Sequence, residues 1–162
     1  MVIDITKKIK NSKELKNTAF ELLDQLPKEA TEQNGGAMML ALIGPLGAGK
    51  TSLTQALGEA LGVEQPITSP TFVLRKKYQT TNSYFDQLIH YDCYRLDDPG
   101  ELRELGWQKD VERFGNLICL EWADRVPNIW PVNTWRVEML VNGEEERTIR
   151  VKRDSQEGGG RL

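Results

Sequence analysis

A glycine-rich segment that ends in Lys-Thr is the part of the sequence best suited to chemistry. It runs from Gly44 to Thr51, reads GPLGAGKT, and fits the G-x-x-x-x-G-K-[ST] pattern of phosphate-binding loops at every fixed position. In such a loop, glycines let backbone N–H groups approach phosphate oxygens closely, and the N-terminus of the next helix adds partial positive charge. The residues of this segment expected to bind the nucleotide are Gly44, Leu46, Gly47, Ala48, Gly49, Lys50, Thr51 and Ser52.

Two of these side chains have specific roles in nucleotide chemistry. We expect the Lys50 ammonium group to reach the β and γ phosphates, and the Thr51 hydroxyl to ligate Mg²⁺. The simpler alternative is a glycine-rich turn between a strand and a helix that binds no ligand. Such a turn has no need of Lys-Thr at its end, so the pattern favours a nucleotide site.

The segments on either side of the loop must position it, and both fit this interpretation. Residues 37–43 form an unbroken apolar run, which is typical of a strand buried on both faces in a parallel sheet. After the loop, apolar residues recur along one helix face and precede Gly62, which can end that helix. These apolar residues are Leu53, Ala56, Leu57, Ala60 and Leu61.

Two acidic residues follow apolar strands and are candidates for facing a metal ion. Asp92 ends a segment that also holds His90, the only histidine, for which a structural role is the simpler interpretation. Glu121 ends the segment NLICLE, which has the shape of a Walker B strand, although Asp is usual at its end. Carboxylates at strand C-termini face the ligand crevice of open α/β sheets. Spacing alone leaves both residues open for the metal-facing role.

A loop rich in Thr, Ser and Pro follows the predicted phosphate-loop helix. Pro70 disfavours a helical Ser69, so we expect extended backbone that presents Thr68 and Thr71 to the phosphates. Nucleotide switches use a loop threonine in this way to sense the γ phosphate through Mg²⁺. Without the upstream phosphate loop, the same residues would be interpreted as an ordinary turn.

The remaining segments predict a helix and several strands around this centre. Residues 2–6 resemble a short strand, and Ser12 is suited to cap a helix that stops at Pro27. Alternating segments separated by polar turns predict two antiparallel hairpins. Their strands are residues 72–78 with 84–91, and residues 134–141 with 147–152.

Composition excludes several classes of protein. The chain has 162 residues, of which 39% are hydrophobic, and it lacks both the roughly 18-residue apolar run of a membrane span and the apolar core of a signal peptide. We therefore expect a cytoplasmic protein with no membrane partner. Its net charge of -3 argues against holding a nucleic-acid backbone unaided. The two cysteines, Cys93 and Cys119, are interpreted as buried reduced residues.

The segments GPLGAGKT, TSPTF, HYDCYRLDDPGEL and LICLEW together closely resemble the bacterial TsaE (YjeE) family, over about residues 10–150. The resemblance implies an α/β fold of the P-loop NTPase type, with three α/β/α layers, a mixed sheet and antiparallel hairpin extensions. We expect a single P-loop ATPase domain in residues 1–153 and a flexible tail in residues 154–162. The family's function implies Mg²⁺-dependent ATP binding and slow hydrolysis. It also implies action with TsaB and TsaD in threonylcarbamoyladenosine modification beside the tRNA anticodon, with tRNA contacted only through the partners.

The same resemblance implies roles for individual residues. Thr51 and Glu121 would bind Mg²⁺, while Lys50, Asp92 and Thr71 would serve catalysis and Thr68 would belong to the switch. Trp122 would pack the site or lie at the partner surface. The adenine would lie between the start of the first helix and the last hairpin, at Ser12 and Arg147.

Two other functions are compatible with a phosphate-binding loop. One is a small-molecule kinase with Asp92 as base for an acceptor hydroxyl, and the other is a nucleotide-gated binding module that does not hydrolyse its ligand. The chain lacks the N-K-x-D segment that normally selects guanine, which favours ATP over GTP. It also shows no convincing arginine finger, since Arg95, Arg103 and Arg125 are equally well interpreted as surface residues. We therefore expect slow turnover until a partner completes the site.

Overall fold

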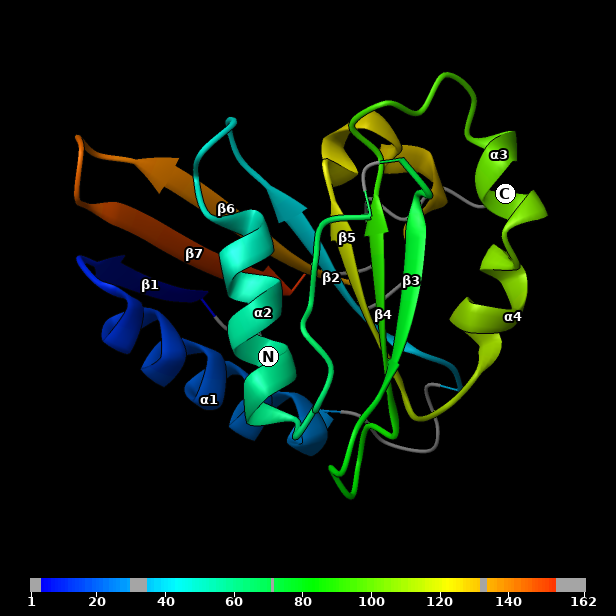
Figure 1. The fold of residues 1–162 in the computed structure, drawn as a ribbon, viewed down its shortest axis with the longest axis horizontal. Coiled ribbons are helices and arrows are strands. Elements are labelled where there is room, and N and C mark those ends of the chain that lie inside the picture. The colour runs from blue at the N-terminus through cyan, green and yellow to red at the C-terminus, as the bar shows by residue number, and fades with distance from the viewer. Residues whose placement is uncertain (1–3, 30–34, 71, 132–133, 154–162) are drawn as a thin grey trace.

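The computed structural model describes residues 4–29, 35–70, 72–131 and 134–153. These residues form one seven-stranded sheet in the order β1-β7-β6-β2-β5-β4-β3 (Figure 1). The strands are β1 (Asp4–Ile9), β2 (Met38–Ile43), β3 (Arg75–Gln79), β4 (Gln87–Asp92), β5 (Asn116–Glu121), β6 (Trp135–Val141) and β7 (Arg147–Arg153). The predicted tail, residues 154–162, lies outside the described residues.

The sheet is mixed, as the sequence predicted. Four neighbouring strands, β6, β2, β5 and β4, run parallel to one another. Both predicted hairpins are present as antiparallel pairs, β3 with β4 and β6 with β7. The first strand, β1, pairs antiparallel with the last, β7, so the two lie side by side at one edge of the sheet.

Helices cover the two faces of the sheet unequally. The long helix α1 (Ser12–Glu29) and helix α2 (Lys50–Ala60) pack on one face, against a core that includes Leu40 and Leu42 of β2. The short helices α3 (Gly100–Glu104), α4 (Trp107–Glu112), η2 (Ala123–Arg125) and η3 (Pro127–Ile129) accompany the other face. There the core includes Met39 and Ala41. Alternate residues of β2 thus serve opposite cores, as a strand period of two requires.

None of the described helices combines the length with the apolar character needed to cross a membrane. The described elements form the three α/β/α layers that the family resemblance implied.

Helix α1 begins and ends differently from the prediction. Asn11 caps it in place of Ser12, because the Asn11 Oδ1 atom accepts a hydrogen bond of 2.9 Å from the Glu14 N–H. The Glu14 carboxylate in turn accepts a hydrogen bond of 2.6 Å from the Lys10 N–H. The helix passes through Pro27 to Glu29. Proline disfavours a helical residue before it, but the fixed φ of proline suits a helix, and full burial of Leu26 outweighs the local preference.

Candidate nucleotide site

The phosphate-binding loop lies between the carboxyl end of β2 and the start of α2. Gly47 has a φ of 79° and Gly49 has a φ of 101°. Both are left-handed backbone conformations that residues with a Cβ atom rarely adopt. Gly44 is required for a different reason, since a Cβ atom there would lie 2.5 Å from the carbonyl oxygen of Met139 in β6. The loop is therefore held close to the sheet, with its glycines at the positions that need them.

A cavity of about 390 Å³ lies over the loop, at the carboxyl ends of the parallel strands. This is where open α/β sheets bind ligands. Loop residues form one side of the cavity, and residues at the carboxyl ends of β4 and β5 form the other. Its lining comprises Leu46, Gly47, Gly49, Lys50, Thr51, Ser52, Ser69, Asp92, Tyr94, Glu121 and Trp122.

The geometry separates the two acids that spacing could not. The Thr51 hydroxyl donates a 2.7 Å hydrogen bond to Glu121 Oε1, which joins the loop to the end of β5. Asp92 stands directly opposite Glu121 in the sheet register, but accepts from the Tyr94 N–H at 2.9 Å and the Ser69 hydroxyl at 3.3 Å. Of the two, Glu121 is thus the carboxylate in contact with the residue expected to ligate Mg²⁺.

Lys50 is turned back onto its own loop. Its ammonium group donates to the carbonyl oxygens of Gly44 at 2.7 Å and Pro45 at 2.9 Å, and lies 4.0 Å from the centre of the Trp122 ring. Burial lowers the pKa of Lys50, while the negative charges of Glu121, Asp124 and Asp92 act in the opposite direction. The ammonium group lies in the same cavity as both acids, where an anionic ligand would replace its carbonyl partners.

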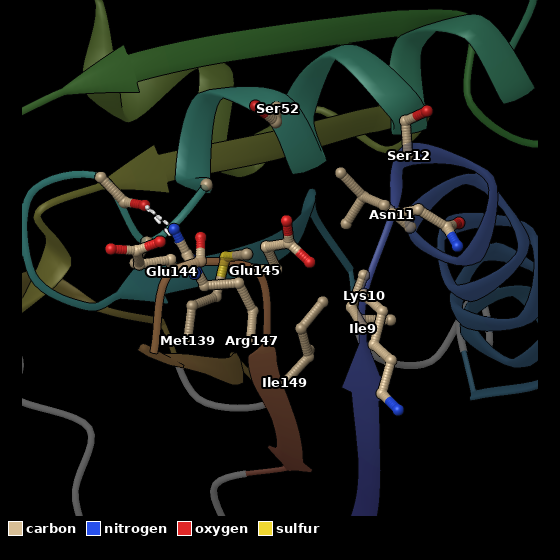
Figure 2. Close-up of a pocket in the computed structure, with 14 residues that line it drawn as sticks. Ile9, Lys10, Asn11, Ser12, Ser52, Met139, Glu144, Glu145, Arg147 and Ile149 are labelled. Carbon is tan, nitrogen blue, oxygen red and sulfur yellow. Dashed lines mark hydrogen bonds between the residues drawn. The ribbon is translucent and has the colours of Figure 1, made fainter. Parts of the chain in front are cut away.

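A second cavity, of about 310 Å³, adjoins the first and shares Gly47, Gly49 and Ser52 with it. Figure 2 shows side chains from β1, the start of α1, α2 and the last hairpin around this space. Apolar side chains of β1, α1, β6 and β7 line part of it, namely Ile9, Leu15, Met139 and Ile149. Polar residues lie among them, including Ser12 and Arg147, for which the family resemblance implied a position beside the adenine.

Arg147 connects the last hairpin to the phosphate-binding loop. Its Nε and Nη2 atoms each donate a 3.3 Å hydrogen bond to the Gly47 carbonyl oxygen. Its Nη1 atom donates to the Gly143 carbonyl oxygen at 3.1 Å, within the hairpin turn. The guanidinium group therefore holds one wall of the second cavity against the loop.

The loop with the predicted switch threonines is only partly described. Thr71 lies outside the described residues, so its predicted role stays a prediction. The Thr68 hydroxyl accepts a hydrogen bond from the Lys76 ammonium group, and Thr68 does not belong to the residues that line either cavity. Ser69, which the sequence did not single out, lines the phosphate cavity and contacts Asp92.

His90 is buried, in agreement with the structural role that the sequence favoured, but the sequence did not predict its contact. Its Nε2 atom lies 2.7 Å from Glu121 Oε1, in a position with no solvent exposure. The available signal was the spacing of His90 and Asp92, which puts both side chains on the same face of one strand. Without the pairing of β4 with β5, that spacing did not reveal Glu121 as the partner.

The donors around the phosphate cavity suit a hard cation. Thr51, Glu121 and Asp92 supply hydroxyl and carboxylate oxygens, the ligand type that Mg²⁺ prefers. Among the described residues, no group of three or more His, Cys, Asp or Glu side chains could hold a metal ion. Mg²⁺ at nucleotide sites usually takes only one or two protein ligands, besides phosphate oxygens and water.

Comparison with known proteins gives consistent results. Residues 9–149 match the family model of "Threonylcarbamoyl adenosine biosynthesis protein TsaE". The chain is 36% identical over 110 residues to the TsaE protein of Nostoc, covering 66% of this chain and 64% of that protein. It is 37% identical over 112 residues to TsaE of Bacillus subtilis, covering 68% and 66%, respectively. The matches thus span just under two thirds of these relatives. The crystal structure of Bacillus subtilis YdiB is similar, with a TM-score of 0.70, 25% identity, and coverage of 98% of this chain and 90% of that chain.

Proposed function

The chain belongs to the TsaE family of threonylcarbamoyl adenosine biosynthesis proteins, and from this membership we propose that it is a cytoplasmic, Mg²⁺-dependent ATPase required for threonylcarbamoyladenosine modification of tRNA. TsaB and TsaD are its proposed partners, and tRNA is contacted only through them. The relatives from Nostoc and Bacillus subtilis are each named a tRNA threonylcarbamoyladenosine biosynthesis protein.

One observation carries the proposal: the Lys-Thr end of a glycine loop faces a strand-end carboxylate. Lys50, Thr51 and Glu121 all line the phosphate cavity, and the Thr51 hydroxyl already donates to the carboxylate. The Thr51 hydroxyl can keep donating this hydrogen bond to Glu121 while a lone pair of its oxygen faces a cation. The adjoining apolar cavity supports binding of a base beside the phosphates.

The residues of the chain would divide the work of phosphoryl transfer. Loop amides and Lys50 would bind the β and γ phosphates once the ammonium group leaves the Gly44 and Pro45 carbonyls. Thr51 and Glu121 would hold Mg²⁺, which when bound neutralises charge on the phosphates. Asp92 would accept a hydrogen bond from the attacking water and orient it.

Slow turnover of the isolated chain is part of the proposal. An arginine that stabilises the transferring phosphoryl group is worth about 10³–10⁵ in rate. Arg147 contacts the loop, but its donors are engaged by backbone carbonyls. The Cζ atom of Arg125 lies 5.4 Å from the centre of the Tyr94 ring, and that of Arg95 lies 4.6 Å from the centre of the Phe72 ring. Neither arginine is among the residues that line the phosphate cavity. We therefore propose that the TsaB–TsaD pair completes the site.

The test measures ATP binding and turnover with and without purified TsaB and TsaD. We expect Mg²⁺-dependent binding, slow phosphate release alone and faster release with the partners. Lys50→Ala and Glu121→Ala should abolish the stimulated rate. Lys109→Ala, which removes a lysine from a separate cavity beside α4, is the matched control and should keep it.

Each contrary result has a defined meaning. Undiminished stimulation in both site variants would overturn the site assignment. Turnover of about ten per second without partners, an ordinary value for a complete enzyme, would refute completion by a partner. Transfer of phosphate to an added small-molecule acceptor, in place of phosphate release, would identify a kinase.

A further inference from the structure

Two side chains contact the same carboxylate oxygen of Glu121, at the edge of the phosphate cavity. Glu121 Oε1 lies 2.7 Å from the Thr51 hydroxyl on one side and 2.7 Å from His90 Nε2 on the other. Among the described residues, both hydrogen bonds to this carboxylate fall on Oε1. None of the described residues donates a hydrogen bond to the second oxygen, Oε2, and Glu121 lines the phosphate cavity.

The sheet places His90 under Glu121 as a direct result of register. Strands β4 and β5 are parallel, with Asp92 opposite Glu121 and His90 opposite Cys119. Because side chains alternate along a strand, all four of these side chains occupy the same face of the sheet. His90 lies one step deeper than Asp92 and is fully buried, so it cannot touch a nucleotide in the cavity.

The surroundings of the imidazole define which nitrogen carries its proton. A carboxylate is only an acceptor, so the 2.7 Å contact requires a proton on Nε2. Among the described residues, the buried Nδ1 atom has no hydrogen-bond partner. A proton on Nδ1 would bury an unsatisfied donor, whereas a neutral ring protonated on Nε2 leaves only an unfilled lone pair there. The geometry therefore favours the neutral Nε2–H tautomer.

We propose that His90 is a positioning residue that fixes the Glu121 carboxylate for Mg²⁺. A glutamate has one more rotatable bond than the aspartate usual at this strand end, so it needs an additional constraint to hold one orientation. The Thr51 hydroxyl and the His90 N–H supply that constraint from opposite sides of Oε1. Partners behind a metal-binding group typically change metal affinity by about 10–100-fold when they are removed.

This inference rests on the proposed function, because it assigns Glu121 to Mg²⁺ at an ATP site. Three substitutions of His90 separate positioning from simple packing. His90→Gln keeps an amide N–H at about the reach of Nε2. His90→Asn has the same chemistry, but its amide lies closer to the backbone, near the position of Nδ1. His90→Leu keeps bulk and removes the donor.

The main experiment titrates Mg²⁺ and measures the affinity of the full chain for a fluorescent ATP analogue. Its readout is the Mg²⁺ concentration that gives half of the maximal increase in this affinity. We expect His90→Leu and His90→Asn to raise this concentration about tenfold or more, and His90→Gln to stay within about threefold of wild type. Affinity for the analogue in EDTA should change less than about twofold in all three variants. Thermal unfolding midpoints identify any variant that is misfolded. If His90→Leu is misfolded, the comparison of His90→Gln with His90→Asn tests the positioning role.

A second readout needs no metal. Since His90 is the only histidine, an imidazole ¹⁵N NMR spectrum reports on it alone, and we expect a neutral ring protonated on Nε2. A ring protonated on Nδ1 and not on Nε2, or equal Mg²⁺ requirements in the Gln and Asn variants, would overturn the inference. If wild type fails to bind the analogue with Mg²⁺, the proposed function itself fails. If wild type binds and the three variants match it, only the role of His90 is refuted.

Discussion

Replacing Gly44 by alanine tests the close approach of the phosphate-binding loop to strand β6. The new Cβ atom would lie 2.5 Å from the Met139 carbonyl oxygen and 3.2 Å from the Ala48 Cβ atom. Carbon and oxygen atoms normally touch at about 3.3 Å, so the loop and β6 must separate by roughly 0.8 Å. Neither side can yield easily, because β2 and β6 are paired up to Ile43 and Glu138.

The size of the effect follows from this geometry. Inserting a methyl group into a filled space typically costs about 1–3 kcal/mol. For a chain of this size, each kcal/mol lowers the unfolding midpoint by about 2–4 °C. A displaced loop also lengthens hydrogen bonds from its amides to phosphate, and one bond to a charged group is worth about 1.5–3 kcal/mol. We therefore expect nucleotide affinity to fall by about tenfold or more.

Thermal unfolding and titration with a fluorescent ATP analogue measure the two effects. Gly100→Ala is the matched control, because its Cβ atom would meet Asp98 Oδ1 at an ordinary 3.4 Å. That variant should remain within about 0.5 kcal/mol of wild type and bind the analogue normally. If Gly44→Ala unfolds at the wild-type temperature and binds with wild-type affinity, the described approach of the loop to β6 is wrong.

Three further predictions concern stability away from the loop. Asp110→Ala should lower the free energy of unfolding, measured by urea denaturation, by about 3–5 kcal/mol. The substitution removes the carboxylate that accepts hydrogen bonds from Arg75 at 2.7 Å and from the Tyr91 hydroxyl at 2.5 Å. Tyr91→Phe removes only one donor and should cost about 1 kcal/mol in the same assay; a larger loss than for Asp110→Ala would contradict the network. Burial raises the pKa of the Cys93 and Cys119 thiols from 9.0 to about 12. Between these two pH values only the unfolded chain ionises the thiols. Their contribution to stability is therefore complete below pH 9 and is lost as the pH rises toward 12. Urea unfolding at pH 8 and at about pH 10.5 should therefore show wild type losing about 2 kcal/mol more per thiol than a Cys93→Ala/Cys119→Ala variant, and equal losses would contradict the burial of the thiols.

The local parts of the site were predictable because local sequence determines them. The apolar run before Gly44, the loop itself and the helix stripe after it each depend on neighbours within a few residues. The NLICLE segment ending at Glu121 was recognisable for the same reason. Both hairpins were predictable from alternating patterns around polar turns.

The parts that sequence could not predict depend on which strands become neighbours. Thr51 meets Glu121 and not Asp92 because β5 is the strand next to β2, with β4 one place further away. The contact of His90 with Glu121 has the same origin. No local pattern encodes strand order, so spacing alone left the two acids equivalent, and only the resemblance to the TsaE family favoured Glu121 for the metal before the sheet was known.

The prediction of the residue that caps α1 was wrong for a different reason. Ser12 and Asn11 are both good capping residues and are adjacent. The choice between them depends on where the chain leaves β1, which pairs with β7 through Ile9. A boundary set by the partner of the preceding strand cannot be read from the capping residues alone.

The pairing of β1 with β7 has a consequence for the synthesis of the protein. A nascent chain that has emerged from the ribosome as far as β5 already contains the phosphate-binding loop and both acids. The second cavity also needs Ile9 from β1, with Arg147 and Ile149 from β7, so its walls come together only after β7 has been translated. The proposed binding of the base would therefore require translation through β7, and a product that stops after β6 would keep the phosphate loop without this cavity.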